Sequence, residues 1–165
     1  MDVGCGGGRT INKLAAIATE GMVYGIDYSK GSVAASRHHN AGLIRAGRVE
    51  IRRASVSHLP FPDEKFDLVT AVETHYYWPD LATDMTEIRR TLKSGGALIM
   101  IAESYKGGKY GTLQGLAMKP LRAAQLSIDE HRQLFLAAGF SDVRMFENRN
   151  KGWICGTGRA PRSAF

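Results

Sequence analysis

The chain has 165 residues, is 44% hydrophobic and carries a formal net charge of +6. This length suits one domain with its own core, so we expect residues 1–165 to form a single domain. No apolar run approaches the length of a membrane span and no leader peptide is recognisable, which favours a cytoplasmic protein. The two cysteines are too few for a disulfide framework or a metal-ligand set, and the five histidines lack the spacing of paired metal ligands. We therefore expect no metal site.

The first nine residues, MDVGCGGGR, predict a ligand-binding turn. A β-branched residue beside an acid is typical of a strand end. Glycines at positions 4, 6 and 8 then allow a sharp turn and close approach to a ligand. A helix is expected over residues 10–20, ended by Gly21. The free amides at its start suit a carboxylate or phosphate group.

A second strand, residues 22–27, ends in Asp27, which lies 19 residues after Gly8. This is close to the spacing at which an aspartate accepts hydrogen bonds from a ribose, and it predicts an adenosine-type site. The glycines run G-C-G-G-G rather than G-x-G-x-x-G, and Asp2 precedes the turn. An acid there disfavours a pyrophosphate and favours an ammonium group. We therefore expect a ligand that combines adenosine with an amine.

The other elements follow from hydrophobic periodicity and from cap signals, among them a capping box predicted at residues 127–130. Helices are expected at about 29–47, 81–92 and 127–138, and strands at 48–54, 66–73, 97–103, 143–146 and 153–158. The alternating pattern of 48–54 places that strand near a sheet edge. Residues 104–126 contain four basic side chains and no acid, and we expect them to form a basic cover over the substrate.

Four sequence blocks occur in the order and spacing of one family: DVGCGGG at 2–8, GID at 25–27, LPFPDEKFDLV at 59–69 and LKSGG at 92–96. The chain resembles the class I S-adenosylmethionine-dependent methyltransferases, most of all the small-molecule branch with the ubiquinone and menaquinone C-methyltransferases. The resemblance implies a Rossmann-like α/β sandwich with a mostly parallel sheet and an antiparallel C-terminal hairpin. It also implies S-adenosylmethionine as cofactor and S-adenosylhomocysteine as product.

The resemblance implies a cofactor site made by Asp2, Gly4, Cys5, Gly6, Asp27, Tyr28, Ser55, Val56, Glu73 and Thr74. The glycine turn surrounds the methionine part, Asp27 holds the ribose hydroxyls, and Glu73 and Thr74 lie near the sulfonium. Tyr28, Ser55 and Val56 surround the adenine. Family members usually place an aspartate at the position of Ser55, and a neutral acceptor there predicts weaker binding.

The acceptor is expected beside residues 75–79, HYYWP, because ligands in open α/β sheets lie beyond the carboxyl ends of the strands. The alternative is that these aromatic residues only pack the next helix against the sheet. For an oxygen or nitrogen acceptor, His75, Tyr76 and Tyr110 are the candidate groups for removing a proton. For an electron-rich carbon, positioning alone suffices. The sequence does not choose between these acceptors.

The glycine turn begins only four residues from the start of the chain, whereas relatives have a full first strand and helices before it. We expect either a naturally short or misassigned start, or a fragment whose missing segment covers the cofactor. Both readings leave an open site or a surface that a second copy of the chain covers as a homodimer.

Three functions remain open from the sequence. The leading one is methyl transfer to a small molecule. An RNA methyltransferase is suggested by the basic second half, but the basic residues are scattered and no Asn/Asp-Pro-Pro-aromatic motif follows residues 66–72. A cofactor-binding but inactive protein is suggested by the short start and by Ser55.

Overall fold

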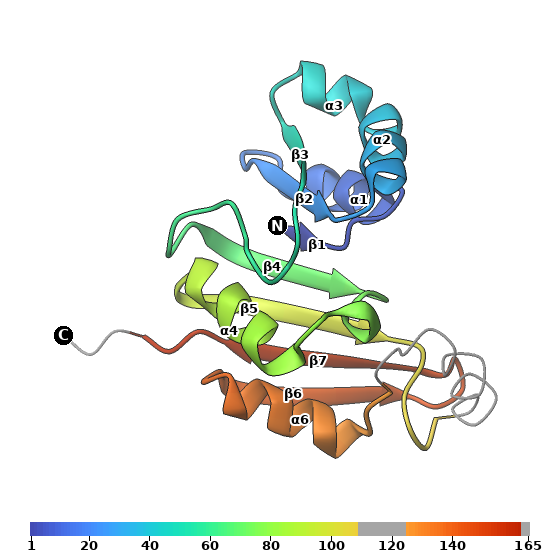
Figure 1. The fold of residues 1–165 in the computed structure, drawn as a ribbon, viewed down its shortest axis with the longest axis vertical. Coiled ribbons are helices and arrows are strands. Elements are labelled where there is room, and N and C mark those ends of the chain that lie inside the picture. Colours follow the sequence, from blue (N-terminus) through green and yellow to red (C-terminus); the bar gives the residue numbers. More distant parts are fainter. Residues whose placement is uncertain (109–124, 163–165) are drawn as a thin grey trace.

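A computed structural model describes residues 1–108 and 125–162. They form a seven-stranded sheet in the order β3-β2-β1-β4-β5-β7-β6 (Figure 1). The strands are β1 Asp2–Val3, β2 Val23–Asp27, β3 Val49–Arg53, β4 Phe66–Val72, β5 Leu92–Ala102, β6 Ser141–Asn148 and β7 Trp153–Arg159. Strands β1 to β5 are parallel, whereas β7 runs antiparallel to both β5 and β6. The predicted mostly parallel sheet with a C-terminal antiparallel hairpin is confirmed, and β3 lies at the edge as expected.

The helices of the described residues are α1 Arg9–Ile17, α2 Lys30–His39, α3 Ala41–Arg45, the short 3₁₀ helix η1 His75–Tyr77, α4 Leu81–Thr91 and α6 Ile128–Ala137. The prediction of one helix over 29–47 was wrong, because α2 ends at His39 and α3 follows. Asn40 separates them. Its side-chain amide donates to the carbonyls of Gly8 and Ser36, each at 3.0 Å, and so joins the end of α2 to the glycine turn.

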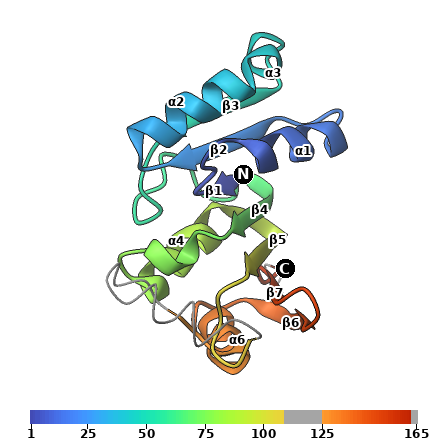
Figure 2. The same ribbon diagram turned by 90° about the vertical axis from the view of Figure 1, so that its right-hand side faces the viewer.

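Helices cover both faces of the sheet, as the alternation of side chains along β2 shows. Val23 packs in one cluster with Ile11 of α1. Ile26 belongs to a second cluster, which includes Ile88 of α4 and Phe135 of α6. Figure 2 shows α1 and α2 beside β2, and α4 and α6 beside the other half of the sheet. No described helix is long and apolar enough to cross a membrane.

The boundary between α4 and β5 differs from the prediction. A helix over 81–92 and a strand over 97–103 were expected, but β5 already begins at Leu92. Gly95 has a φ of 76°, and its amide donates to the Ala160 carbonyl at 3.0 Å. Pairing with the end of the chain thus extends the strand, and the extra residues form a bulge where the β4–β5 register shifts.

The predicted capping box at the start of α6 is confirmed. The Ser127 hydroxyl accepts from the Glu130 amide at 3.2 Å, and the Glu130 carboxylate accepts from the Ser127 amide at 2.7 Å. We expect Ser127→Ala to lower the free energy of unfolding by about 1 kcal/mol, because the first turn loses a side-chain acceptor. Urea denaturation measures this loss, and Ser57→Ala, at an exposed serine outside any helix, is the matched control. Equal stability of the two variants would contradict the prediction.

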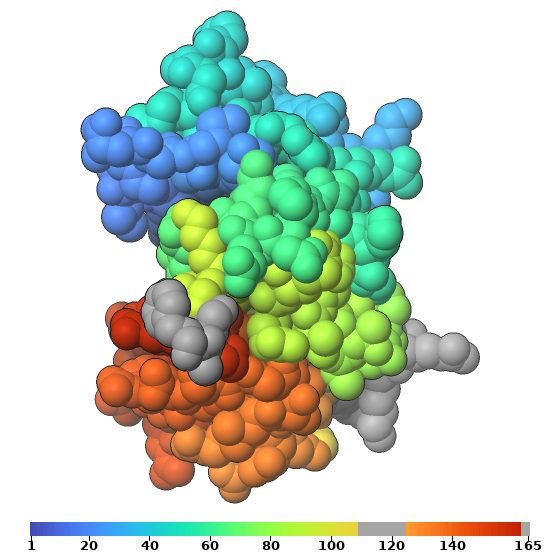
Figure 3. All heavy atoms as spheres, turned by 90° about the vertical axis from the view of Figure 1, so that its left-hand side faces the viewer, coloured from blue at the N-terminus to red at the C-terminus, as the bar shows by residue number. Residues whose placement is uncertain are grey.

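The strand order places a topological switch point at β1 and β4. From β1 the chain proceeds to β2 and β3 on one side, and from β4 to β5 on the other. Figure 3 shows the N-terminal third at one end of the molecule and the C-terminal third at the opposite end. In open sheets of this kind, ligands bind beyond the carboxyl ends of the strands at the switch point.

Candidate cofactor site

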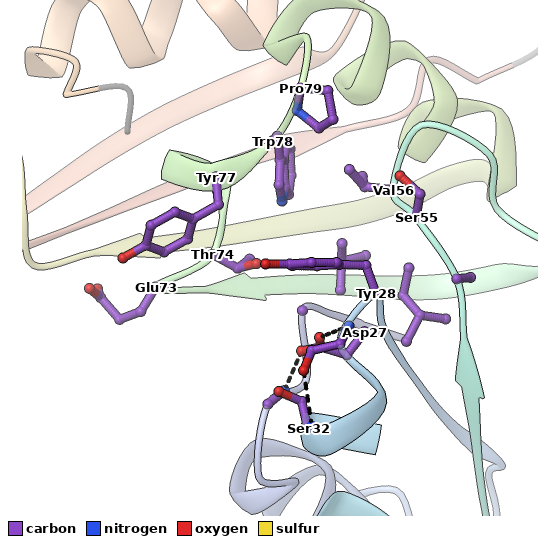
Figure 4. A pocket seen from close by; sticks show the side chains of 16 residues that line it. Asp27, Tyr28, Ser32, Ser55, Val56, Glu73, Thr74, Tyr77, Trp78 and Pro79 are labelled. Atoms are coloured by element: carbon purple, nitrogen blue, oxygen red, sulfur yellow. Dashed lines mark hydrogen bonds between the residues drawn. The ribbon is translucent and has the colours of Figure 1, made fainter. Parts of the chain in front are cut away.

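A cavity of about 760 Å³ lies at the carboxyl ends of β1 to β4. This volume is in the range of ligand pockets. Its wall consists of Val3, Gly4, Gly6, Ile26, Asp27, Tyr28, Ser29, Ser32, Ala54, Ser55, Val56, Glu73, Thr74, Tyr77, Trp78 and Pro79 (Figure 4). Eight of the ten residues predicted from the sequence for the cofactor site line this cavity: Gly4, Gly6, Asp27, Tyr28, Ser55, Val56, Glu73 and Thr74.

Asp27 ends β2 and is held in one orientation by backbone amides. One carboxylate oxygen accepts from the Gly6 amide at 3.0 Å, and the other accepts from the Ser29 amide at 2.9 Å. Asp27 as a whole residue is only 9% exposed. Each oxygen keeps a further lone pair for a donor in the cavity. The arrangement suits a ligand that offers two neighbouring hydroxyl groups.

Gly4 and Gly6 shape the turn for different reasons. Both have positive φ, 69° and 50° respectively. A Cβ on Gly4 would lie 1.9 Å from the Thr74 hydroxyl oxygen, whereas a Cβ on Gly6 would meet no atom within 4 Å. Gly4 therefore permits close contact between the turn and the end of β4. Gly6 leaves open space beside Asp27, as a backbone cradle for a ligand requires.

Glu73 follows β4 and has a φ of 55°, which is rare for a residue with a side chain. Its carboxylate accepts from the Tyr76 hydroxyl at 3.0 Å and also from the Glu103 amide. Burial raises the pKa of Glu73, while these two hydrogen bonds oppose the rise. Glu73 is therefore a half-buried acid fixed in the cavity wall.

The two ends of the cavity differ in character. Figure 4 shows Glu73 and Tyr77 at one end and Ser55 and Val56 at the other, with Asp27 below the space between them. The described part of the wall contains two acids, Asp27 and Glu73, and no lysine, arginine or histidine. A ligand with a positive charge is complementary to this wall.

Asp2 and Cys5 lie outside the described cavity wall. Asp2 is 2% exposed and accepts a hydrogen bond from the Thr70 hydroxyl at 2.6 Å. Burial raises its pKa to about 6. Cys5 packs in the core beside Ser36, and burial raises its pKa to about 11. The ligand contacts predicted for these two residues stay predictions.

The two described candidates for proton removal, His75 and Tyr76, lie outside the cavity wall. His75 is fully buried, with its Nε2 at 3.0 Å from Nε2 of His131 in α6. Tyr76 is 4% exposed and turns its hydroxyl toward Glu73. Neither lines the described wall. Tyr110 lies outside the described residues, as does most of the expected cover segment 104–126.

The cavity wall also includes residues that were not predicted to bind the cofactor. Tyr77, Trp78 and Pro79 line it directly, and they belong to the segment 75–79 beside which the acceptor was expected. Ser29 and Ser32 contribute from the start of α2, where the Ser29 hydroxyl accepts from the Ser32 amide at 3.3 Å. A serine at the start of a helix, two residues after Asp27, was the available signal for these two.

Comparison with known proteins identifies the family. The family model described as "Methyltransferase domain" matches residues 1–100. A Mycobacterium tuberculosis protein named as a probable S-adenosylmethionine-dependent methyltransferase is 28% identical over 98% of this chain and 52% of its own length. The demethylmenaquinone methyltransferase of Lactiplantibacillus plantarum is 36% identical over 63% of this chain and 44% of its own length. The chain thus spans about half the length of these curated relatives.

Solved structures share the fold at low sequence identity. A chain of the complex between the Haloferax volcanii Trm112 methyltransferase activator and a methyltransferase matches with a TM-score of 0.84 at 22% identity, over 98% of this chain and 81% of that one. The [4+2]-cyclase SpnF matches with a TM-score of 0.77 at 20% identity, over 98% of this chain and 75% of that one. The fold therefore carries more than one activity. On the family match, this chain belongs to the class I S-adenosylmethionine-dependent methyltransferases.

Proposed function

We propose that this chain binds S-adenosylmethionine in the cavity at the switch point and transfers its methyl group to a small molecule. The orientation of Asp27 supports this proposal most directly. Its carboxylate is fixed by the amides of Gly6 and Ser29 and is open to a vicinal diol such as that of ribose. The open space at Gly6 provides room for the ligand.

The residues of the cavity fit the cofactor from end to end. With the ribose at Asp27, the base points toward Ser55 and Val56, and the amino acid part points toward Glu73 and Thr74. The acidic wall is complementary to the net positive charge of the cofactor. When bound, the cofactor supplies an activated methyl group, so the protein residues chiefly bind, orient and exclude water.

The acceptor side is aromatic. Tyr77 and Trp78 line the cavity, with Tyr77 53% exposed and Trp78 9% exposed. Because no basic residue lies in the described wall, this surface favours a neutral or cationic small molecule over a phosphate-rich nucleic acid. Curated relatives include small-molecule enzymes such as the demethylmenaquinone methyltransferases. Small-molecule methyl transfer is therefore better supported than RNA methylation.

We expect micromolar binding of S-adenosylmethionine by the wild-type chain and a loss of at least about a hundredfold in Asp27→Ala. The reason is that two charge-assisted hydrogen bonds to the ribose disappear. Isothermal titration calorimetry with S-adenosylmethionine and S-adenosylhomocysteine measures both affinities.

Asp67→Ala is the matched control, because Asp67 is an exposed acid that pairs with Lys93 at the start of β4. It is expected to bind like the wild type. Urea denaturation of Asp27→Ala separates lost binding from lost folding, since Asp27 also holds two backbone amides. Failure of the wild type to bind either ligand, or unchanged binding by a folded Asp27→Ala, would refute the proposed function.

A further inference from the structure

We propose that Tyr76 is a positioning residue, which acts on the cofactor through Glu73 without reaching the cavity itself. This inference rests on the proposed function. Tyr76 is 4% exposed and is not part of the described cavity wall, whereas Glu73 is. The hydroxyl of Tyr76 connects the buried interior to the cavity wall through its hydrogen bond to Glu73.

The direction of the hydrogen bonds around Tyr76 follows from the chemistry of the partners. The Ser104 amide lies 3.0 Å from the Tyr76 hydroxyl oxygen, and an amide N–H only donates. The hydroxyl therefore accepts from Ser104 and directs its own proton to a Glu73 carboxylate oxygen, 3.0 Å away. The second carboxylate oxygen accepts from the Glu103 amide. Each oxygen of Glu73 thus accepts one hydrogen bond from a fixed donor.

The backbone of Glu73 is also held in place. Its φ of 55° costs about 1–2 kcal/mol for a residue with a Cβ. Such a conformation persists where the surroundings hold it. Here the Glu73 amide donates to the Ile101 carbonyl at 3.0 Å, and Thr74 packs against Gly4. These contacts place the acid at the cavity end that lies away from Ser55 and Val56 (Figure 4).

A fixed carboxylate at that end is suited to the positively charged amino acid part of the cofactor. Charge-assisted hydrogen bonds are stronger than neutral ones, and their strength depends on a fixed geometry. We infer that Glu73 recognises the ammonium end, and that Tyr76 keeps Glu73 in position for this contact. The simplest alternative is that Tyr76 only packs with Tyr105 and Ile154, its neighbours in one buried cluster.

Two ligands distinguish these roles. S-adenosylhomocysteine carries the amino acid part, whereas 5′-methylthioadenosine lacks it but keeps adenine and ribose. We expect Tyr76→Phe to weaken S-adenosylhomocysteine binding about tenfold and to leave 5′-methylthioadenosine binding within about twofold of the wild type. A purely structural role would weaken both ligands alike. Titration calorimetry provides all four dissociation constants.

Tyr105→Phe is the matched control, because Tyr105 is a buried tyrosine of the same cluster whose hydroxyl donates to Glu147 at 3.0 Å. It should bind both ligands like the wild type. Glu73→Gln is expected to lose S-adenosylhomocysteine selectively, and Tyr76→Phe in that background should cause no further loss. Additive losses would contradict action through Glu73.

A second variant tests for misfolding of Tyr76→Phe, which removes the hydroxyl that accepts from the Ser104 amide. Incorporation of 4-aminophenylalanine at position 76 keeps a donor for Glu73 and should retain selective binding of S-adenosylhomocysteine. Equal effects on both ligands, or none, would overturn the positioning role while leaving the proposed function intact. Absence of wild-type binding to either ligand would overturn both.

Discussion

Gly4→Ala is expected to lower the free energy of unfolding by about 2–5 kcal/mol. The new Cβ would lie 1.9 Å from the Thr74 hydroxyl oxygen and 2.6 Å from its Cβ, so the glycine turn and the end of β4 must move apart. Overpacking of this kind costs about 1–3 kcal/mol, and a φ of 69° adds about 1–2 kcal/mol for alanine. Urea denaturation followed by circular dichroism measures the loss.

Gly7→Ala is the matched control, since Gly7 has no positive φ and a Cβ there would meet no atom within 4 Å. We expect it to change stability by less than about 0.5 kcal/mol. Thr74→Gly in the Gly4→Ala background should recover the steric part of the loss but not the part due to φ. If Gly4→Ala were as stable as Gly7→Ala, the close contact at Thr74 would not limit the turn.

Replacement of His75 and His131 by leucine is expected to reduce the free energy of unfolding that the protein loses between pH 8 and pH 5. Nδ1 of His131 lies 2.7 Å from the Ser127 carbonyl, which only accepts, so Nδ1 carries the proton. Nε2 of His131 then accepts from Nε2 of His75 at 3.0 Å. Both rings are neutral in this arrangement, and Nδ1 of His75 has no partner in the described structure.

The sign of the effect follows from the pKa shifts. Burial lowers the pKa of His75 from 6.5 to about 3 and also lowers that of His131. Between these pH values the unfolded chain binds more protons than the folded one. The stability that neutral His75 contributes is therefore complete above pH 6.5 and is lost as the pH falls toward 3. At pH 5 the loss from His75 alone is about 2 kcal/mol.

The measurement compares urea denaturation of the wild type and of His75→Leu/His131→Leu at pH 8 and pH 5. We expect the wild type to lose about 2 kcal/mol or more relative to the variant between these pH values. Asp2, whose pKa is raised to about 6, has the opposite pH dependence but is common to both proteins. His38→Gln/His39→Gln removes two exposed histidines and should behave like the wild type. Parallel pH profiles of wild type and leucine variant would refute the neutral pair.

Local signals in the sequence predicted the elements and the cofactor end of the site. The glycine spacing and the position of Asp27 can be read from the first two strands and the segment between them. About thirty residues were therefore enough to predict this part of the site. The capping box at Ser127 is similarly local. Each of these features depends on residues within a few turns of each other, where spacing and geometry are closely related.

Features that depend on distant contacts were not predicted. The pairing of His75 with His131 joins residues 56 positions apart. His75 was a candidate base because it follows the end of a strand, and its distant partner could not be seen from that position. Asn40 divides the expected long helix by bonding to Gly8, a contact that spacing along the chain does not reveal. The early start of β5 depends on pairing with Ala160. Tertiary hydrogen bonds decided each of these cases.

The acidic wall of the cavity has a consequence for turnover. On the proposed function, methyl transfer converts a sulfonium ion into a neutral thioether, so the bound cofactor loses one positive charge in the step. The described cavity wall contains the acids Asp27 and Glu73 and no basic side chain. It therefore attracts the positively charged S-adenosylmethionine more strongly than the product, which has no net charge. The same side chains therefore bind S-adenosylhomocysteine less tightly than S-adenosylmethionine, which favours release of the product and binding of a new S-adenosylmethionine molecule after each turnover.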